Sequence, residues 1–103
     1  MEKKYRLKVT EQFEEELYGI ASYITNDLKN PIASVNLIDV IYEAVDNRLL
    51  HPIGFKKYAS KNNPEEVYYK IYVKNFTVFY VVIDDVMECR RIIYSHRDLE
   101  NLV

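Results

Sequence analysis

The chain has no tryptophan, two glycines, two histidines and one cysteine among its 103 residues. A single cysteine, Cys89, cannot form an internal disulfide, which is typical of proteins in a reducing compartment. Gly19 and Gly54 are too few for a phosphate-cradling loop. His51 and His96 lie far apart and, with one cysteine, give no metal-ligand spacing. We therefore expect neither a metal nor a cofactor.

Long apolar runs and a strong net charge are also missing. No stretch reaches the roughly 20 apolar residues that span a bilayer, and the opening MEKKYRLK has no apolar run behind its charges, unlike a signal peptide. The net charge is −2, so any surface for a polyanion must come from local clustering. We expect a soluble, cytoplasmic protein with one domain over residues 1–103 and no membrane partner.

Two helices are predicted in the first half of the chain. Thr10 is a good N-cap for the first, and Asn30 followed by Pro31 starts the second. Apolar residues recur at helical spacing in both, at Phe13, Leu17, Ile20, Ile24 and Leu28, and then at Val35, Ile38, Ile41, Val45 and Leu49. Because the connection between them is very short, we expect an antiparallel helical hairpin.

Four strands are predicted around this hairpin, over residues 4–9, 67–74, 76–83 and 86–94. The first two alternate apolar and polar residues, whereas FTVFYVVI (76–83) is almost wholly apolar and indicates a central strand covered on both faces. Residues 55–66 are polar, contain Asn63-Pro64 and read as a loop. The predicted fold class is α+β, in the order β-α-α-β-β-β, with the hairpin packed on one face of a mainly antiparallel four-stranded sheet.

Basic and aromatic residues gather on the outward positions of these strands. They are Lys4, Arg6 and Lys8, then Tyr68, Lys70, Tyr72 and Lys74, and either Arg90 or Arg91. Such a surface can bind a phosphate backbone or an acidic protein. The alternative is a solvated sheet face on which lysines discourage edge-to-edge association.

The chain ends RRIIYSHRDLENLV, which carries further candidates. Arg90 and Arg91 are consecutive and should project to opposite faces, so one of them needs a carboxylate from the hairpin. Tyr94, His96 and Arg97 could together cleave RNA without a metal, with His96 or Tyr94 in proton transfer and Arg97 on the phosphate. The alternatives are that His96 is an ordinary loop residue and that Arg97 pairs with a carboxylate such as Asp98.

Segments along nearly the whole chain resemble toxins of the RelE/ParE superfamily, from bacterial type II toxin–antitoxin modules. They are YRLKVT, FEEELYGIASYI, NPIASVNLIDVIYEAV, LLHPIGF, YYKIYVKNFTVFYVV and the ending RRIIYSHRDL. The resemblance implies the same β-α-α-β-β-β order and a growth inhibitor of the plasmid-stabilisation (addiction) type. It also implies a neighbouring antitoxin as partner, with operator DNA bound only through that antitoxin.

The superfamily has two principal activities, and the resemblance allows both. ParE-like members poison DNA gyrase, whereas RelE-like members cut mRNA on the ribosome. Arg97 and Lys70 fall where the nuclease branch places basic residues, but Thr77 stands where that branch usually has an arginine. We therefore expect gyrase inhibition first, metal-independent mRNA cleavage (an mRNA interferase) second, and a non-toxic binding module third. Residues expected to contact the target or RNA are Lys70, Tyr72, Lys74, Arg90 and Arg91.

Overall fold

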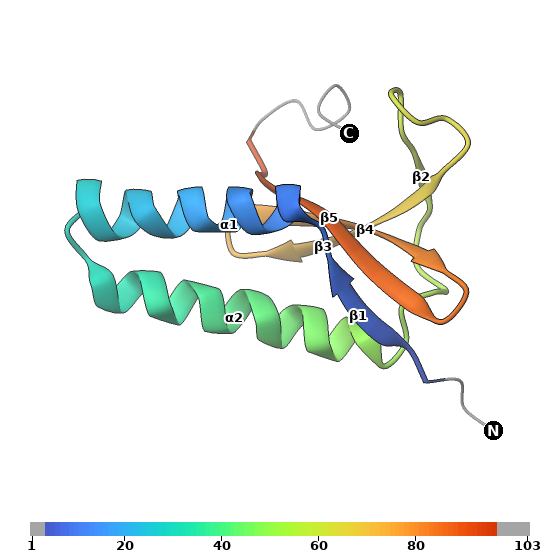
Figure 1. Ribbon diagram of the computed structural model, residues 1–103, viewed down its shortest axis with the longest axis horizontal. Helices are drawn as coiled ribbons and strands as arrows, with labels where there is room; N and C mark the ends of the chain where they lie inside the picture. Colours follow the sequence, from blue (N-terminus) through green and yellow to red (C-terminus); the bar gives the residue numbers. More distant parts are fainter. Residues whose placement is uncertain (1–3, 97–103) are drawn as a thin grey trace.

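The computed structural model describes residues 4–96 and shows a helical hairpin beside a five-stranded sheet (Figure 1). The first helix, α1 (Glu11–Ser22), continues into a π-helical turn, η1 (Tyr23–Asp27), and the second is α2 (Pro31–Leu49). The strands are β1 (Arg6–Val9), β2 (Tyr58–Ala59), β3 (Val67–Val73), β4 (Phe76–Ile83) and β5 (Val86–Tyr94). Their order is β1-β5-β4-β3-β2, and all pairs are antiparallel except β1 with β5. The predicted α+β class and hairpin-on-sheet arrangement are confirmed.

The fifth strand lies inside the segment predicted as a loop. Tyr58 and Ala59 pair antiparallel with Tyr68 and Val67 at the edge of the sheet. The prediction of a continuous loop over 55–66 was therefore wrong at these two positions, as was the count of four strands. Two residues are too few to show a periodic pattern, so their pairing depends on the neighbouring β3 and leaves no local signal in the sequence.

Both helix starts follow the predicted local chemistry. The Thr10 hydroxyl accepts a hydrogen bond from the Phe13 backbone N–H at 3.1 Å, and the Asn30 side-chain oxygen accepts one from Ala33 at 3.1 Å. The first helix then widens, because the Leu28 N–H bonds to the Tyr23 carbonyl, five residues back, at 3.1 Å. A π-helical turn of this kind shifts the positions that follow it around the helix axis.

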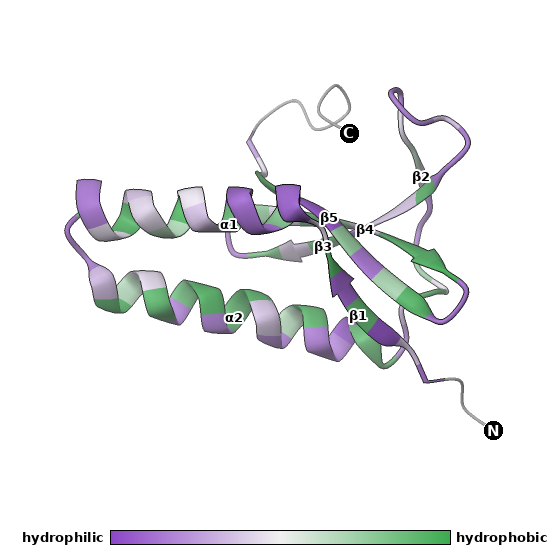
Figure 2. Cartoon of the chain, viewed as in Figure 1, coloured by the Kyte–Doolittle hydropathy of each residue, from purple (hydrophilic) through white to green (hydrophobic). Residues whose placement is uncertain are grey.

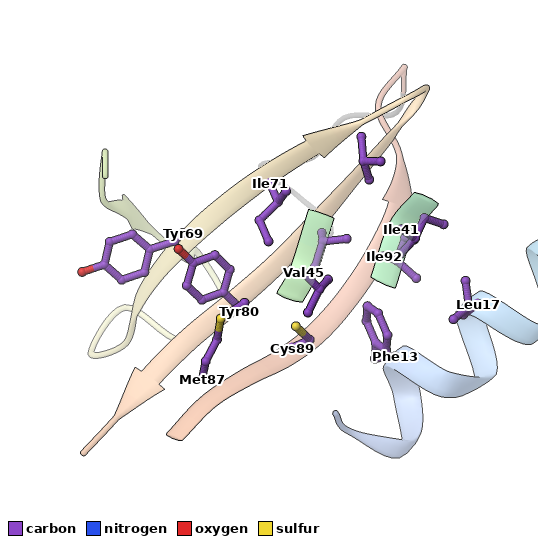
Figure 3. Packing of buried hydrophobic residues seen from close by; sticks show 12 residues of the cluster. Phe13, Leu17, Ile41, Val45, Tyr69, Ile71, Tyr80, Met87, Cys89 and Ile92 are labelled. Carbon is purple, nitrogen blue, oxygen red and sulfur yellow. The ribbon is translucent and has the colours of Figure 1, made fainter. Parts of the chain in front are cut away.

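The main core lies between the hairpin and one face of the sheet. Phe13, Ile41 and Val45 from the helices pack with Tyr80 and Cys89 from the strands, as Figure 3 shows. Each fully buried apolar side chain of this size contributes about 1.5–3 kcal/mol to folding. Two members of the predicted stripes, Leu28 and Val35, are instead exposed. They lie near the tip of the hairpin, which projects beyond the sheet in Figure 1.

The reverse face of the sheet is not bare. A second cluster of Tyr68, Phe79, Val81 and Ile93 is buried there, with Tyr58 packed against it. The nearly all-apolar β4 is thus covered on both faces, as predicted. The expectation that Tyr68 faces solvent was wrong, because β2 and the chain around it cover that part of the face.

A β-bulge in β5 reverses the alternation of its side chains. Phe79 pairs with Arg91 and Tyr80 with Cys89, so Arg90 is an extra residue on its strand. As a result Cys89 and Ile92 both belong to the core beneath the helices, whereas Ile93 belongs to the reverse cluster. At the bulge the two consecutive arginines project toward different partners.

No helix among residues 4–96 is long and apolar enough to cross a membrane.

Candidate functional site

Arg91 turns toward the helices and binds Glu16 of α1. Its Nε lies 2.9 and 3.0 Å from the two carboxylate oxygens of Glu16, and its Nη2 lies 2.8 Å from one of them. The same carboxylate accepts a hydrogen bond from the Ile92 backbone N–H at 3.2 Å. The structure therefore supplies the helix carboxylate that the paired arginines led us to expect. Through these contacts Glu16 connects α1 to the part of β5 that directly follows the bulge.

Arg90 lies on the reverse face and is held by three side chains. It forms ion pairs with Glu66 and with Glu88, at 3.0 Å for the latter, and donates to the Tyr68 hydroxyl at 3.1 Å. The hydrogen bond from Arg90 holds the pKa of Glu66 below its ordinary value. Burial lowers the pKa of Arg90, but the hydrogen bonds with Glu66, Tyr68 and Glu88 outweigh it and keep that pKa raised. This network fixes the chain before β3 to β5.

The other two arginines within residues 4–96 are also engaged. Arg6 donates to Asp85 at 3.1 and 3.2 Å. Arg48 donates to the Tyr80 hydroxyl at 3.0 Å and to the Lys70 carbonyl at 3.1 Å, and its guanidinium lies 3.6 Å from the Phe55 ring centroid. All four arginines of this part of the chain thus have protein partners. Arg97, the arginine proposed for the scissile phosphate, lies outside the described residues.

Tyr80 anchors the connection that follows α2. Its hydroxyl donates to the Pro52 carbonyl at 2.7 Å while accepting from Arg48. Burial raises the pKa of Tyr80, although Arg48 acts in the opposite direction. Cys89 is also buried, and burial raises the pKa of its thiol to about 12, which suits a core residue and not a nucleophile.

Tyr94 and His96 lie together at the end of β5. Their ring centroids are 5.0 Å apart, Tyr94 also meets Phe76 edge-on at 5.7 Å, and both Tyr94 and His96 are exposed. The segment is fixed by Ser95, whose N–H donates to Asn75 O at 2.8 Å. The Ser95 hydroxyl lies 2.8 Å from that of Thr77. Thr77 itself is fully buried, at 0% exposure.

The predicted target-binding residues fall into separate groups. Lys70 and Tyr72 lie on the reverse face at the β2 edge, near Tyr58, whereas Arg91 reaches the opposite, helix side. Lys74 is not in β3 but in the turn after it, with a positive φ of 54°. The five residues therefore do not form one surface.

An apolar groove separates the outer half of the hairpin from the end of the sheet. Its volume is about 670 Å³, and it is lined by Ile20, Tyr23, Ile24 and Leu28 of the first helix, Ala33 and Leu37 of α2, and Lys74, Phe76, Ile92 and Tyr94 of the sheet end. In Figure 2 hydrophobic segments recur along both helices out to the part that projects beyond the sheet. Sequence analysis missed this groove. Its signal was the apolar spacing of Ile20, Ile24 and Leu28, which continues to the end of the first helix.

Two comparisons relate the chain to known proteins. The family model described as "ParE toxin of type II toxin-antitoxin system, parDE" matches residues 7–99. One similar solved structure is "Chromosomal ParDE TA system from P. aeruginosa", with a TM-score of 0.71 and 16% sequence identity, over 88% of this chain and 96% of that one. At this identity the structural match shows a shared fold. No curated protein matches.

Within residues 4–96 no three His, Cys, Asp or Glu side chains gather so as to hold a metal ion.

Proposed function

We propose, from the premise that the chain belongs to the ParE toxin family of type II toxin–antitoxin systems, that it arrests growth by inhibiting DNA gyrase until an antitoxin neutralises it. The contact with gyrase is assigned to the exposed end of β5, where Tyr94 and His96 stand beside one another. Arg97 follows directly in the sequence and belongs to the same proposed contact.

The state of Thr77 is the observation that favours gyrase over RNA cleavage. This position, where the nuclease branch usually carries an arginine, holds a neutral side chain that is fully buried and hydrogen-bonded to the Ser95 hydroxyl. The arginines of β5 are paired with Glu16, Glu66 and Glu88, so their charge is already offset by neighbouring carboxylates. Phosphoryl-transfer chemistry needs cationic donors directed at the developing charge, and the two arginines of β5 are instead directed at carboxylates of the protein itself.

Ribosome-dependent cleavage of mRNA is the second candidate. Its support is the exposed Tyr94–His96 pair, which could move a proton, followed by Arg97. Primer extension on translated mRNA after induction would then show codon-linked cuts that disappear in Arg97→Ala. Intact message in growth-arrested cells would eliminate this candidate.

The test of the proposed function uses induction in cells with and without the adjacent gene. We expect growth to stop, reporter plasmid DNA to lose negative supercoils, and the adjacent gene to restore both. Tyr94→Ala/His96→Ala is the variant expected to spare growth, and Glu15→Ala, on the exposed side of α1, is its matched control. Unaffected growth would instead leave a non-toxic binding module, and arrest with unchanged plasmid topology would refute gyrase as the target.

The groove is the site at which we place the antitoxin. Its lining is mainly apolar and comes from both helices and the sheet end, and it includes the π-helical turn. An amphipathic segment that folds on binding could bury its apolar face in such a groove. The rim residue Lys74 would meet an acidic side chain of that segment.

Ile24→Asp should separate antitoxin binding from toxicity. The substitution puts a charge in the groove, so the variant should still arrest growth but no longer be rescued by the adjacent gene. Ile32→Asp is the control, because Ile32 is 74% exposed and is not part of the groove lining. Thermal unfolding of the two variants should first be shown to match. If the adjacent gene then fully restores growth in cells that express Ile24→Asp, the antitoxin binds elsewhere.

A further inference from the structure

Two lysines meet the ring of Tyr58 at the β2 edge of the sheet. The Lys70 ammonium lies 3.9 Å from the Tyr58 ring centroid and 5.7 Å from that of Phe79, and the Lys56 ammonium lies 5.4 Å from the Tyr58 ring. Lys70 was among the residues expected to contact the target or RNA, whereas residues 55–66 were predicted to form a loop. The strand β2 brings Lys56 and Tyr58 to the side of β3.

Within residues 4–96, no carboxylate forms an ion pair with Lys56 or Lys70. Among the described residues, Arg6, Lys8, Arg90 and Arg91 form ion pairs, whereas the ammonium groups of Lys56 and Lys70 lie over aromatic rings. A protein with a net charge of −2 has acidic residues available for pairing. Cation–π contacts hold an ammonium group in place while leaving its positive charge available to a ligand.

Tyr72 completes this arrangement. It is 64% exposed and lies beside Tyr58, whose hydroxyl helps to raise the pKa of Tyr72, on the same face of the sheet as Lys70. The patch thus contains the exposed ring of Tyr72 beside Tyr58, over whose ring the two ammonium groups lie. An exposed tyrosine ring next to lysines is the arrangement on which an unpaired base stacks while its phosphates meet the cations.

We propose that the patch of Lys56, Tyr58, Lys70 and Tyr72 binds single-stranded nucleic acid, with phosphates at the two ammonium groups and a base stacked on Tyr72. A duplex keeps its bases within its own stack and could offer phosphates alone. An acidic peptide would satisfy the lysines but would leave the exposed ring of Tyr72 without a stacking partner. The inference goes beyond the proposed function, because it concerns a contact that needs neither gyrase nor antitoxin.

The test is fluorescence anisotropy of a labelled oligothymidylate of about ten nucleotides titrated with the purified full chain. Each phosphate contact contributes about 0.7 to the slope of log affinity against log salt concentration on a single strand. Lys56→Ala/Lys70→Ala should therefore lower that slope by about 1.4. Lys8→Ala is the matched control, since Lys8 is an exposed lysine of β1 that pairs with Glu88 of β5. In the sheet, β1 lies three strands from β3.

Substitutions of Tyr72 separate stacking from charge. Tyr72→Ala should weaken binding by about five- to 150-fold, the range for losing one stacked base. Tyr72→Phe keeps the ring and should bind like the wild type. A duplex of the same length should bind more weakly and should not respond to Tyr72→Ala.

Several results would overturn the proposal. One is a Lys56→Ala/Lys70→Ala variant that loses no more affinity than Lys8→Ala. Another is equal binding of Tyr72→Ala and wild type. A third is displacement of the oligonucleotide by oligoglutamate of equal charge as efficiently as by unlabelled oligothymidylate, which would assign the patch to an acidic protein segment.

Discussion

Replacing Glu16 by alanine should destabilise the fold more than any other single change of a carboxylate on α1. The Glu16 carboxylate binds the Arg91 guanidinium through three contacts between 2.8 and 3.0 Å and also accepts the Ile92 N–H at 3.2 Å. The side chains of Glu16 and Arg91 are only 23% and 20% exposed. Removal of Glu16 therefore takes a carboxylate from a largely desolvated cation and a hydrogen-bond acceptor from the backbone of β5.

The expected loss follows from this burial. Breaking a fully buried ion pair by removing one partner costs about 3–5 kcal/mol, and the partial exposure of this pair reduces the figure to about 2–3 kcal/mol. With a urea m-value of about 1–2 kcal/mol/M for a chain of this size, the unfolding midpoint should fall by about 1–3 M. Because no charge is then left unpaired, Glu16→Leu/Arg91→Leu should recover part of the loss, while the Ile92 N–H still lacks its acceptor.

Urea unfolding followed by circular dichroism measures these differences. Glu15→Ala is the matched control, since Glu15 is the exposed neighbour on the same helix, and it should change the free energy of unfolding by less than about 0.5 kcal/mol. Equal effects of Glu16→Ala and Glu15→Ala would refute the conclusion that the Glu16–Arg91 contact joins α1 to β5.

Three further results are expected. Tyr80→Phe removes both hydrogen bonds of a buried hydroxyl and should lower the free energy of unfolding in urea by about 1–3 kcal/mol. Tyr69→Phe, on the ring stacked against Tyr80, should lower it less. Equal losses of unfolding free energy would contradict the role of the Tyr80 hydroxyl. Burial raises the pKa of Cys89 to about 12, so iodoacetamide should label this thiol slowly in the native protein and rapidly in urea, and equal rates would mean an accessible thiol. Arg90 lowers the pKa of Glu66, so the stability that this pair contributes is present above the ordinary pKa of 4.5 and is lost as the pH falls through the lower pKa of the folded state. The melting temperature of Glu66→Gln should therefore depend less on acid pH than that of the wild type. Parallel curves of melting temperature against pH would contradict this linkage.

Local chemistry allowed much of the fold to be predicted. Thr10 and Asn30 cap their helices through contacts three residues away, and the hydrophobic spacing of the helices reports one apolar face each. The apolar run of β4 correctly indicated a strand covered on both sides. These features depend on residues close in sequence, where spacing rules apply.

The features that the sequence analysis missed depend on residues far apart. The bulge at Arg90 reverses the alternation in β5, and strict alternation could not show that Cys89 and Ile92 share a face. The two-residue strand that places Tyr58 beside Lys70 arises from pairing with β3.

The candidate site was predictable in type but not in detail. A helix carboxylate was expected for one of the paired arginines, but Glu16 lies 75 residues from Arg91, and several acidic residues of the hairpin were equally plausible. The groove depends on how far the hairpin projects beyond the sheet, a relation between elements that no single segment encodes.

Supercoiling of relaxed plasmid by purified gyrase, titrated with the purified chain, tests the proposed function most directly. We predict progressive loss of supercoiling, its recovery when the antitoxin is added, and little inhibition by Tyr94→Ala/His96→Ala. Full supercoiling at a large molar excess of wild-type protein would contradict gyrase as the target.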